Sequence, residues 1–203
     1  MSEIRSRNSL PYLIMSIVVA VSKHNRTVVA ADTMGFYGYQ KVPTDNSKAT
    51  KVRPVGASLL AMTGWSVYDN IIEDYLSKSA KPPPLSNSRE IFTFFTGLWR
   101  ALHEQYPFVN DQSEHKDSPF GDLGSTFMII NSEGIFKISS DTNVSHFKKY
   151  YAIGSGCDYA LGALYPMFEN DDDPARLATT AVETAINFDA YCGGQIELYE
   201  TEQ

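Results

Sequence analysis

Two apolar, β-branched runs lie close together near the start of this chain, and they constrain its fold more than any other feature. Residues 17–23 (IVVAVSK) and 27–31 (TVVAA) are separated by the turn-prone stretch His24, Asn25 and Arg26. This pattern predicts a β-hairpin whose two strands are well buried. A hairpin of that kind needs further layers of secondary structure packed against it.

The rest of the chain alternates between strand-like and helix-like segments. Strand patterns cover residues 50–55, 57–63, 125–131, 134–139, 150–154 and 195–199, and helical patterns cover residues 66–78, 88–105, 157–168 and 174–188. Residues 33–49 are rich in glycine, tyrosine and polar side chains and predict a long loop with a functional role. Residues 107–123 are acidic and predict an exposed insertion loop or a locally disordered segment.

The predicted order is four strands, two helices, three strands, two helices and one strand. Two antiparallel sheets stacked face to face, with a helix pair outside each, would bury this pattern economically. The sequence therefore predicts the α+β class, as a four-layer αββα sandwich of two antiparallel sheets flanked by helix pairs. The 203 residues suit one domain, which we place at residues 16–203, after an upstream segment of residues 1–15.

Charge and cysteine content exclude several classes of protein. The net charge is −7 and no cluster of Lys or Arg offsets it, so we expect no nucleic-acid partner. Cys157 and Cys192 lack CxxC spacing, which favours a reducing, cytoplasmic location over a disulfide framework. No apolar run reaches the roughly 18 residues that span a bilayer, so we expect no membrane partner. The apolar part of residues 1–15 is short and contains Pro11, which argues against a signal peptide.

Common motifs for cofactors and metals are missing. The sequence contains no GxGxxG, no Walker loop, no HExxH and no GxSxG. Its four histidines have no metal-ligand spacing; they are His24, His103, His115 and His146. We therefore expect no cofactor, no metal site and no histidine-based triad.

A series of short motifs, taken in order, is more specific. The segments MSIVVAV, TVVAADT, KATKV and LLAMTGW are followed far downstream by AIGSG and FDAYCGG. In order and spacing they resemble the proteasome β-subunit and bacterial two-ring heat-shock peptidase family of N-terminal-nucleophile hydrolases. The resemblance runs from about Ser16 to Tyr199. It implies a peptide or unfolded protein as substrate and a homo-oligomeric ring, and it leaves open an ATP-dependent unfoldase as a further partner.

The resemblance also implies a nucleophile. In the family the first residue of the mature chain is a threonine whose hydroxyl attacks a peptide carbonyl, while its own α-amine acts as the base. The matching residue here is Ser16, which lacks the methyl group that stiffens a threonine side chain. A free Ser16 amine requires that residues 1–15 be absent, either as a propeptide removed by autolysis or as an upstream extension when translation starts at Met15. The alternative is that Ser16 only begins an inward-facing strand.

The same resemblance assigns three more residues. Asp32 matches the aspartate that ion-pairs with a lysine near the nucleophile, where the positive charge lowers the pKa of the α-amine. Lys51 is the preferred lysine, and Lys48 is the alternative because counting from Ser16 without a gap reaches it. Gly64 matches the glycine whose backbone N–H forms the oxyanion hole. Without catalysis, Asp32 would be a turn carboxylate and Gly64 a strand terminator.

A second small network is implied at the same site. Ser155 matches a family serine close to the α-amine, and Asp189 matches the aspartate that supports it. The next position of that network is usually serine, and here it is Cys192, whose thiol is a poorer hydrogen-bond donor and acceptor. A buried, inert cysteine is the simpler interpretation of Cys192 than a reactive thiol.

Three functions remain open from the sequence. The first is a peptidase that uses Ser16 and assembles into rings, with the 66–78 and 88–105 helices offering apolar faces for packing. The second is a catalytically inactive, proteasome-like structural ring subunit, favoured by serine in place of threonine and by Cys192. The third keeps the nucleophile but cleaves a small-molecule amide.

Overall fold

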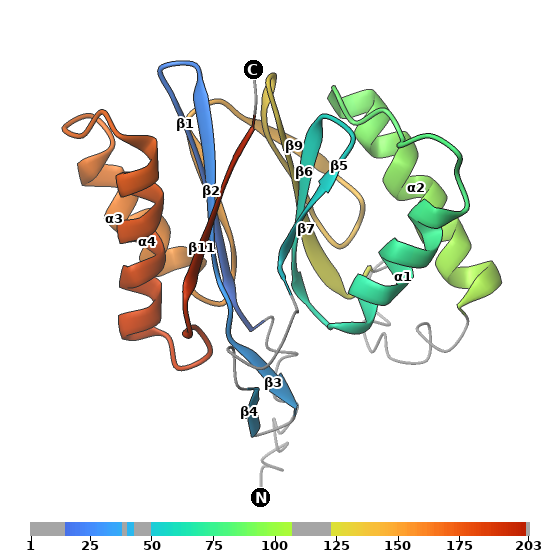
Figure 1. Ribbon diagram of the computed structural model, residues 1–203, viewed down its shortest axis with the longest axis horizontal. Helices are drawn as coiled ribbons and strands as arrows, with labels where there is room; N and C mark the ends of the chain where they lie inside the picture. The colour runs from blue at the N-terminus through green and yellow to red at the C-terminus, as the bar shows by residue number, and fades with distance from the viewer. Residues whose placement is uncertain (1–14, 38–39, 43–49, 107–122, 202–203) are drawn as a thin grey trace, which may run out of the picture.

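The chain folds into four stacked layers. The computed structural model describes residues 15–37, 40–42, 50–106 and 123–201. Two β-sheets stack face to face, and a pair of helices covers the outer face of each sheet (Figure 1). This arrangement confirms the predicted α+β class and the αββα sandwich.

The first sheet contains both strands of the N-terminal hairpin. Its four strands have the order β10-β1-β2-β11, and every neighbouring pair is antiparallel. The strands are β1 (Ile17–Lys23), β2 (Arg26–Asp32), β10 (Tyr150–Gly154) and β11 (Ile196–Thr201). Its outer face is covered by α3 (Cys157–Met167) and α4 (Pro174–Phe188).

The second sheet has five strands in the order β5-β6-β7-β8-β9, again antiparallel throughout. The strands are β5 (Val52–Val55), β6 (Ser58–Gly64), β7 (Ser125–Asn131), β8 (Gly134–Ile138) and β9 (Val144–Phe147). Its outer face is covered by α1 (Val67–Ser77) and α2 (Ser88–Gln105). A small separate hairpin is formed by β3 (Gly35–Tyr37) and β4 (Gln40–Val42).

Strand β1 shows why the N-terminal run is apolar at every position. Ile17 and Val19 pack with α3 and α4, whereas Val18 and Ala20 pack in the layer between the two sheets. All four side chains are fully buried. Because successive side chains of a strand point to opposite faces, a strand between two apolar layers must be apolar throughout. Burying each large aliphatic side chain contributes roughly 1.5–3 kcal/mol.

The predicted strand order is wrong in two places. The segment 33–49, expected to be a loop, contains the β3–β4 hairpin, and β9 was not predicted at all. Both were missed because their strands are only three or four residues long and mix polar with apolar side chains, so they carry little strand signal. The acidic segment 107–122 and residues 43–49 lie outside the described residues.

The exposed apolar surface also differs from expectation. Of the helices expected to offer apolar faces, α2 exposes Phe92, whereas its other large apolar residues pack inward or are partly covered. The outer helix pair of the first sheet exposes more, through Tyr159 and Tyr165 of α3 and Phe188 at the end of α4. Within the described ranges, no helix is long and apolar enough to cross a membrane.

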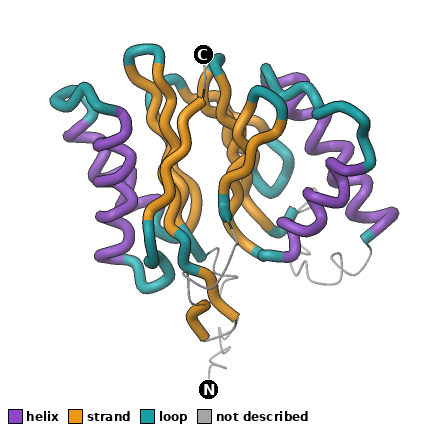
Figure 2. The backbone as a smooth tube through the Cα atoms, viewed as in Figure 1, coloured by secondary structure: helices purple, strands orange, loops and turns teal. Residues whose placement is uncertain are grey.

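Several strands begin or end at the same end of the sandwich, next to the β3–β4 hairpin (Figure 2). Strand β1 begins there with Ile17 opposite Gly154, the last residue of β10. Strand β2 ends there with Asp32 opposite Ile196, the first residue of β11. Residues that lie far apart in the sequence are therefore brought together at strand ends.

Candidate active site

Ser16 lies immediately before β1 and is largely buried, with 7% of its surface exposed. Its carbonyl oxygen accepts hydrogen bonds from the Gly156 backbone N–H and the Ser155 hydroxyl, each at 3.4 Å. Gly154 has a φ of 108°, and a Cβ there would lie 2.1 Å from the same carbonyl oxygen. Strand β10 can therefore end this close to the Ser16 backbone only because its last residue is glycine.

Asp32 is the most completely buried charged group of the site, with no exposed side-chain surface. Its Oδ1 accepts a hydrogen bond from the Ile17 backbone N–H, and its Oδ2 accepts one from the Gly193 backbone N–H, each at 2.9 Å. Lys51 Nζ donates to the same Oδ1 as an ion pair. A buried carboxylate is tolerated when its oxygens are satisfied in this way, so Asp32 joins β1, β2 and the loop before β11 to the second sheet.

Lys51 reaches across from the second sheet. Its Nζ donates to Asp32 and, at 2.9 Å, to the carbonyl oxygen of Met34, while its own carbonyl oxygen accepts from the Met62 backbone N–H at 2.9 Å. Burial lowers the pKa of the Lys51 ammonium, and the negative charge of Asp32 offsets part of that effect. Lys51 is thus the lysine that contacts Asp32, whereas Lys48 lies outside the described residues.

Gly64 ends β6 in a conformation that favours glycine, with a φ of 124°. A Cβ at this position would lie 2.5 Å from the Ser125 hydroxyl oxygen on β7. That same hydroxyl accepts a hydrogen bond from the Trp65 backbone N–H at 3.3 Å. Packing against β7 therefore requires glycine here, whether or not the Gly64 N–H also contacts a substrate.

Ser155, Cys192 and Asp189 form a chain of polar contacts beside Ser16. The Ser155 hydroxyl oxygen lies 3.8 Å from the Cys192 Sγ, and that thiol donates to Asp189 Oδ2 at 3.4 Å. Asp189 Oδ1 accepts from the Tyr191 backbone N–H at 2.9 Å. Burial, and then the negative charge of Asp32, raises the pKa of the Cys192 thiol to about 12. The thiol is therefore neutral and a weak link in the chain.

Sequence reasoning missed several groups that complete the site. Met34 supplies its carbonyl to Lys51, and Gly193 supplies its N–H to Asp32. A Cβ at Gly193 would lie 1.9 Å from the Met34 side chain, so the position requires glycine. The Cys-Gly-Gly run in the sequence was the signal that could have identified this close backbone contact. Glu197 and Tyr199 of β11 were also missed, because their contacts join residues from the two different sheets.

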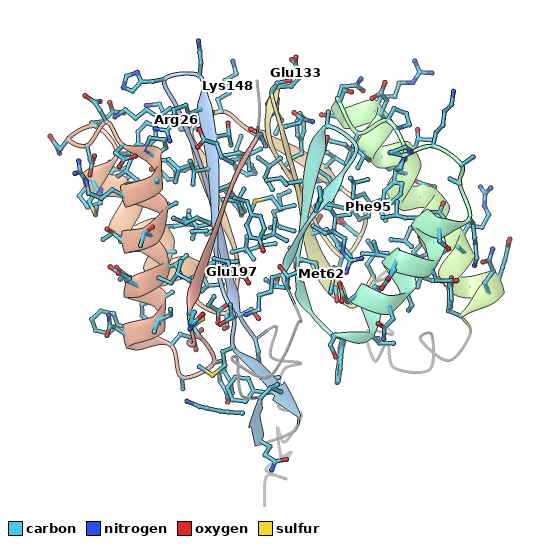
Figure 3. All side chains as sticks on the ribbon, viewed as in Figure 1. Arg26, Met62, Phe95, Glu133, Lys148 and Glu197 are labelled. Carbon is cyan, nitrogen blue, oxygen red and sulfur yellow. The ribbon has the colours of Figure 1, made fainter. Side chains whose placement is uncertain are left out.

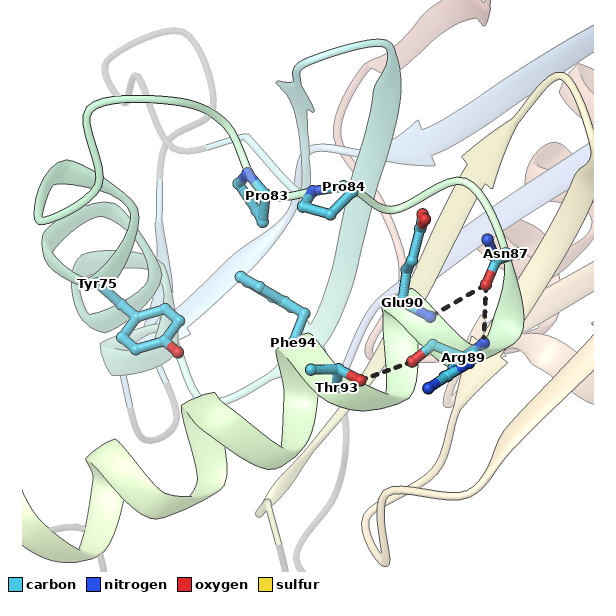
Figure 4. Close-up of a pocket in the computed structure, with 8 residues that line it drawn as sticks. All are labelled: Tyr75, Pro83, Pro84, Asn87, Arg89, Glu90, Thr93 and Phe94. Carbon is cyan, nitrogen blue, oxygen red and sulfur yellow. Dashed lines mark hydrogen bonds between the residues drawn. The ribbon is translucent and has the colours of Figure 1, made fainter.

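In the part of the chain that the structure describes, no group of three or more His, Cys, Asp or Glu residues could hold a metal ion. A pocket of about 590 Å³ lies elsewhere, between α1, the proline-rich connector and α2 (Figure 4). It includes none of the candidate site residues and is lined by Tyr75, Pro83, Pro84, Asn87, Arg89, Glu90, Thr93 and Phe94.

Comparison with known proteins identifies relatives that match along nearly the whole chain, although no family model matches it. A proteasome subunit beta from Nanoarchaeum equitans (strain Kin4-M) is 24% identical over 191 residues, which cover 91% of this chain and 92% of that protein. The structure of Thiobacillus denitrificans BPH is 30% identical with a TM-score of 0.83, covering 92% of this chain and 97% of that one. The chain belongs to the proteasome-type family of N-terminal-nucleophile hydrolases.

Other structures agree with this proteasome-type assignment. Thiobacillus denitrificans BPH in complex with Epoxomicin gives a TM-score of 0.82 at 30% identity and covers 92% of this chain and 98% of that one. Eukaryotic HslV from Trypanosoma brucei gives a TM-score of 0.63 at 18% identity, covering 92% of this chain and 99% of that one. This last likeness supports the fold alone. The sequence-based recognition of the family is therefore confirmed.

Proposed function

We propose that this chain is a proteasome-like peptidase subunit that cleaves peptide bonds by acyl transfer, with Ser16 as nucleophile and its own α-amine as base. The Ser16 hydroxyl oxygen adds to the substrate carbonyl carbon while its proton passes to the α-amine. When the C–N bond breaks, the α-amine returns the proton to the leaving amine. Water then hydrolyses the Ser16 ester by the same proton route. The Gly64 N–H stabilises the oxyanion formed in each step.

The observation that carries this proposal is the ion pair between Lys51 and Asp32 beside the start of β1. Asp32 accepts from the N–H of Ile17, the residue that follows Ser16, so the pair adjoins the nucleophile along the backbone. A positive charge at this place lowers the pKa of the Ser16 α-amine and increases its share of free base near neutral pH. Ser155 and Asp189 are assigned to hold the amine in position.

Activity requires that residues 1–15 be removed, because the Ser16 nitrogen is otherwise an amide rather than a base. Ser16 has a φ of 121°, in a region that a residue with a side chain adopts only under constraint. Backbone strain of this kind costs on the order of 1–3 kcal/mol and is often found at reactive positions. It supports autolytic cleavage, in which the Ser16 hydroxyl attacks the Met15 carbonyl, the peptide C–N bond breaks, and water hydrolyses the resulting ester.

The other parts of the proposal follow from family membership. We assign the chain to a homo-oligomeric ring in the cytoplasm that admits peptide or unfolded protein, with an ATP-dependent unfoldase as a candidate partner. The exposed aromatic side chains Tyr159, Tyr165 and Phe188 on the α3–α4 surface supply apolar area for packing between subunits.

The first experiment is intact mass and N-terminal sequencing of protein expressed without an N-terminal tag. Treatment with an epoxyketone probe such as Epoxomicin follows, because Thiobacillus denitrificans BPH has been solved with that compound. We expect a chain that begins at Ser16 and gains the mass of one probe. The Ser16→Ala variant loses the label, whereas the control Ser66→Ala keeps it, since the Ser66 side chain makes no capping hydrogen bond at the start of α1.

One observation favours a second function, that of a non-catalytic ring subunit. Cys192 stands where the network needs a strong hydrogen-bonding group, and its thiol lies 3.8 Å from the Ser155 hydroxyl. A chain that keeps residues before Ser16 and takes up no probe would replace the peptidase proposal with this one. A labelled chain that is a monomer or dimer and cleaves only small amides would instead indicate the small-molecule amidohydrolase.

A further inference from the structure

A polar cluster with no assigned role includes Thr50, the residue that precedes Lys51. The Tyr199 hydroxyl donates to Glu197 Oε2 at 2.8 Å, and the Thr50 hydroxyl lies 2.8 Å from the Tyr199 hydroxyl and 3.2 Å from the same carboxylate oxygen. The Val52 backbone N–H donates to the Thr50 hydroxyl oxygen at 3.3 Å. Glu197 therefore serves as the acceptor at the end of a chain of donors.

The cluster joins the two sheets at their edges. Thr50 directly precedes Lys51 and β5 at one edge of the second sheet, whereas Glu197 and Tyr199 lie on β11 at one edge of the first sheet. Figure 3 labels Glu197 on β11, toward the end of the sandwich that carries the β3–β4 hairpin. Glu197 and Tyr199 lie opposite Ala31 and Val29 of β2, whose side chains face the layer between the sheets. Their side chains thus face that layer, where Glu197 contacts Thr50, the residue before Lys51.

This placement fixes Lys51 from several directions. Its carbonyl is held by Met62 of β6, and its neighbour Thr50 is held by β11. Its ammonium is held by Asp32 and by the Met34 carbonyl. The hydrogen bonds to Thr50 hold the peptide before Lys51 against the first sheet, so they limit how far the ammonium can move away from Asp32.

Three titratable groups influence the pKa of Lys51. Asp32 lies at the end of β2, the neutral Cys192 thiol lies in the loop before β11, and Glu197 lies on β11. Burial lowers the pKa of Lys51, and the two carboxylates act against it, Asp32 more than Glu197. Glu197 is thus a second carboxylate that favours the protonated lysine without contacting it as an ion pair.

We propose that Glu197, anchored by Thr50 and Tyr199, is a positioning residue that holds Lys51 in place beside Ser16. This inference rests on the proposed function, in which the charge of Lys51 lowers the pKa of the Ser16 α-amine. Glu197 touches neither substrate nor nucleophile in this scheme and acts only through Lys51. Removing the charge of Glu197 therefore lets Lys51 lose its proton at lower pH. The positive charge of Lys51 that lowers the pKa of the Ser16 α-amine is then lost at lower pH as well.

The first test is the pH profile of kcat/KM for peptide cleavage by protein whose Ser16 amine is free. We expect Glu197→Gln to move the alkaline limb of the profile to lower pH by roughly 0.5 to 1 unit, since a partly screened carboxylate shifts a neighbouring pKa by about that much. Tyr199→Phe keeps the ring but removes the donor, so it shifts the limb in the same direction by less. The matched control is Glu200→Gln, whose carboxylate pairs with Arg26 on the surface.

The second test reads Lys51 in the full-length chain whether or not it cleaves a peptide. The ¹³Cε signal of Lys51 is assigned with a Lys51→Met variant and titrated in wild type, Glu197→Gln and Glu200→Gln. We expect a lower Lys51 pKa in Glu197→Gln alone. An unchanged Lys51 titration, or a rate reduced equally at every pH, would overturn the inference. An inactive wild type with free Ser16 but a shifted Lys51 pKa would overturn the proposed function and keep the electrostatic role of Glu197.

Discussion

Replacing Asp32 by asparagine tests whether this one carboxylate holds the site together. The Asp32 side chain has no exposed surface and that of Lys51 is 16% exposed, so the pair is buried. Removing one partner of a buried pair costs about 3–5 kcal/mol of unfolding free energy, because the other charge is left without compensation. The two Asp32 oxygens accept from Ile17, Gly193 and Lys51, and an asparagine NH₂ must face at least one of these donors.

The pH dependence of this loss has a defined sign. Without the Asp32 charge, the pKa of Lys51 falls further below its unfolded value of about 10.4. Between the two pKa values the unfolded chain binds the extra proton, so the stability of Asp32→Asn rises with pH across that window. The deficit relative to wild type is therefore larger near neutral pH than near about pH 10.

Urea unfolding followed by tryptophan fluorescence measures this effect. All variants are compared at one fixed protein concentration, which keeps the comparison valid for a monomer and for an oligomer. Asp32→Asn, Lys51→Met and the double variant form a cycle. We expect the double variant to lose less unfolding free energy than the two single variants combined, by about 2 kcal/mol or more. The reason is that the double variant leaves no buried charge unpaired. Additive losses, or an Asp32→Asn variant within about 1 kcal/mol of wild type, would refute the reasoning.

Three further changes test other parts of the site. Ser16→Gly and Ser16→Ala both lack the hydroxyl needed for autolysis and keep the residues before position 16, but only the glycine relieves the strain of a φ of 121°. We expect urea unfolding to show up to about 1 kcal/mol more stability for Ser16→Gly than for Ser16→Ala, and the epoxyketone assay to label neither; a glycine variant that is less stable than the alanine variant would contradict this. Gly64→Ala places a Cβ 2.5 Å from the Ser125 hydroxyl, so we expect it to lower the unfolding free energy by roughly 2–4 kcal/mol. The double variant Gly64→Ala/Ser125→Gly removes the hydroxyl and should recover part of that loss. If the single and double variants lose the same amount of stability, the clash is not the cause. Cys192→Ser places a strong hydrogen-bond donor between Ser155 and Asp189, so we expect a higher kcat for peptide cleavage at unchanged KM. An unchanged kcat would show that the thiol does not limit catalysis. In wild type, iodoacetamide at about pH 8 should modify Cys157 before Cys192, because burial raises the pKa of the Cys192 thiol to about 12.

Long, regular elements could be predicted from the sequence because their burial is written into the residue pattern. Strand β1 is apolar at consecutive positions since layers cover both its faces, and α4 begins at Pro174 after the Asp173 cap. Helix α2 likewise begins after Asn87, whose side chain accepts from two backbone N–H groups. These signals are local, so a single sequence contains them.

Short strands and contacts between sheets could not be predicted in this way. The choice between Lys48 and Lys51 depends on how many residues the chain uses between β2 and β5, and the three-residue strands of the intervening hairpin carry no clear pattern. The contact between Thr50 and Glu197 joins residues 147 positions apart and exists only because the two sheets stack with their edges aligned. Nothing near either residue in the sequence indicates the other.

The position of Asp32 explains why mutating the ion pair alone cannot distinguish a catalytic role of this residue from a structural one. The same carboxylate accepts hydrogen bonds from the start of β1 and from the loop before β11, and it forms an ion pair with Lys51. Because these contacts stabilise the fold, a ring subunit without activity would also gain stability from keeping Asp32. A loss of stability in an Asp32 variant would therefore fit both candidate functions. The groups that only catalysis needs are the free amine and hydroxyl of Ser16, and it is their state in the mature chain that separates a peptidase from a structural subunit.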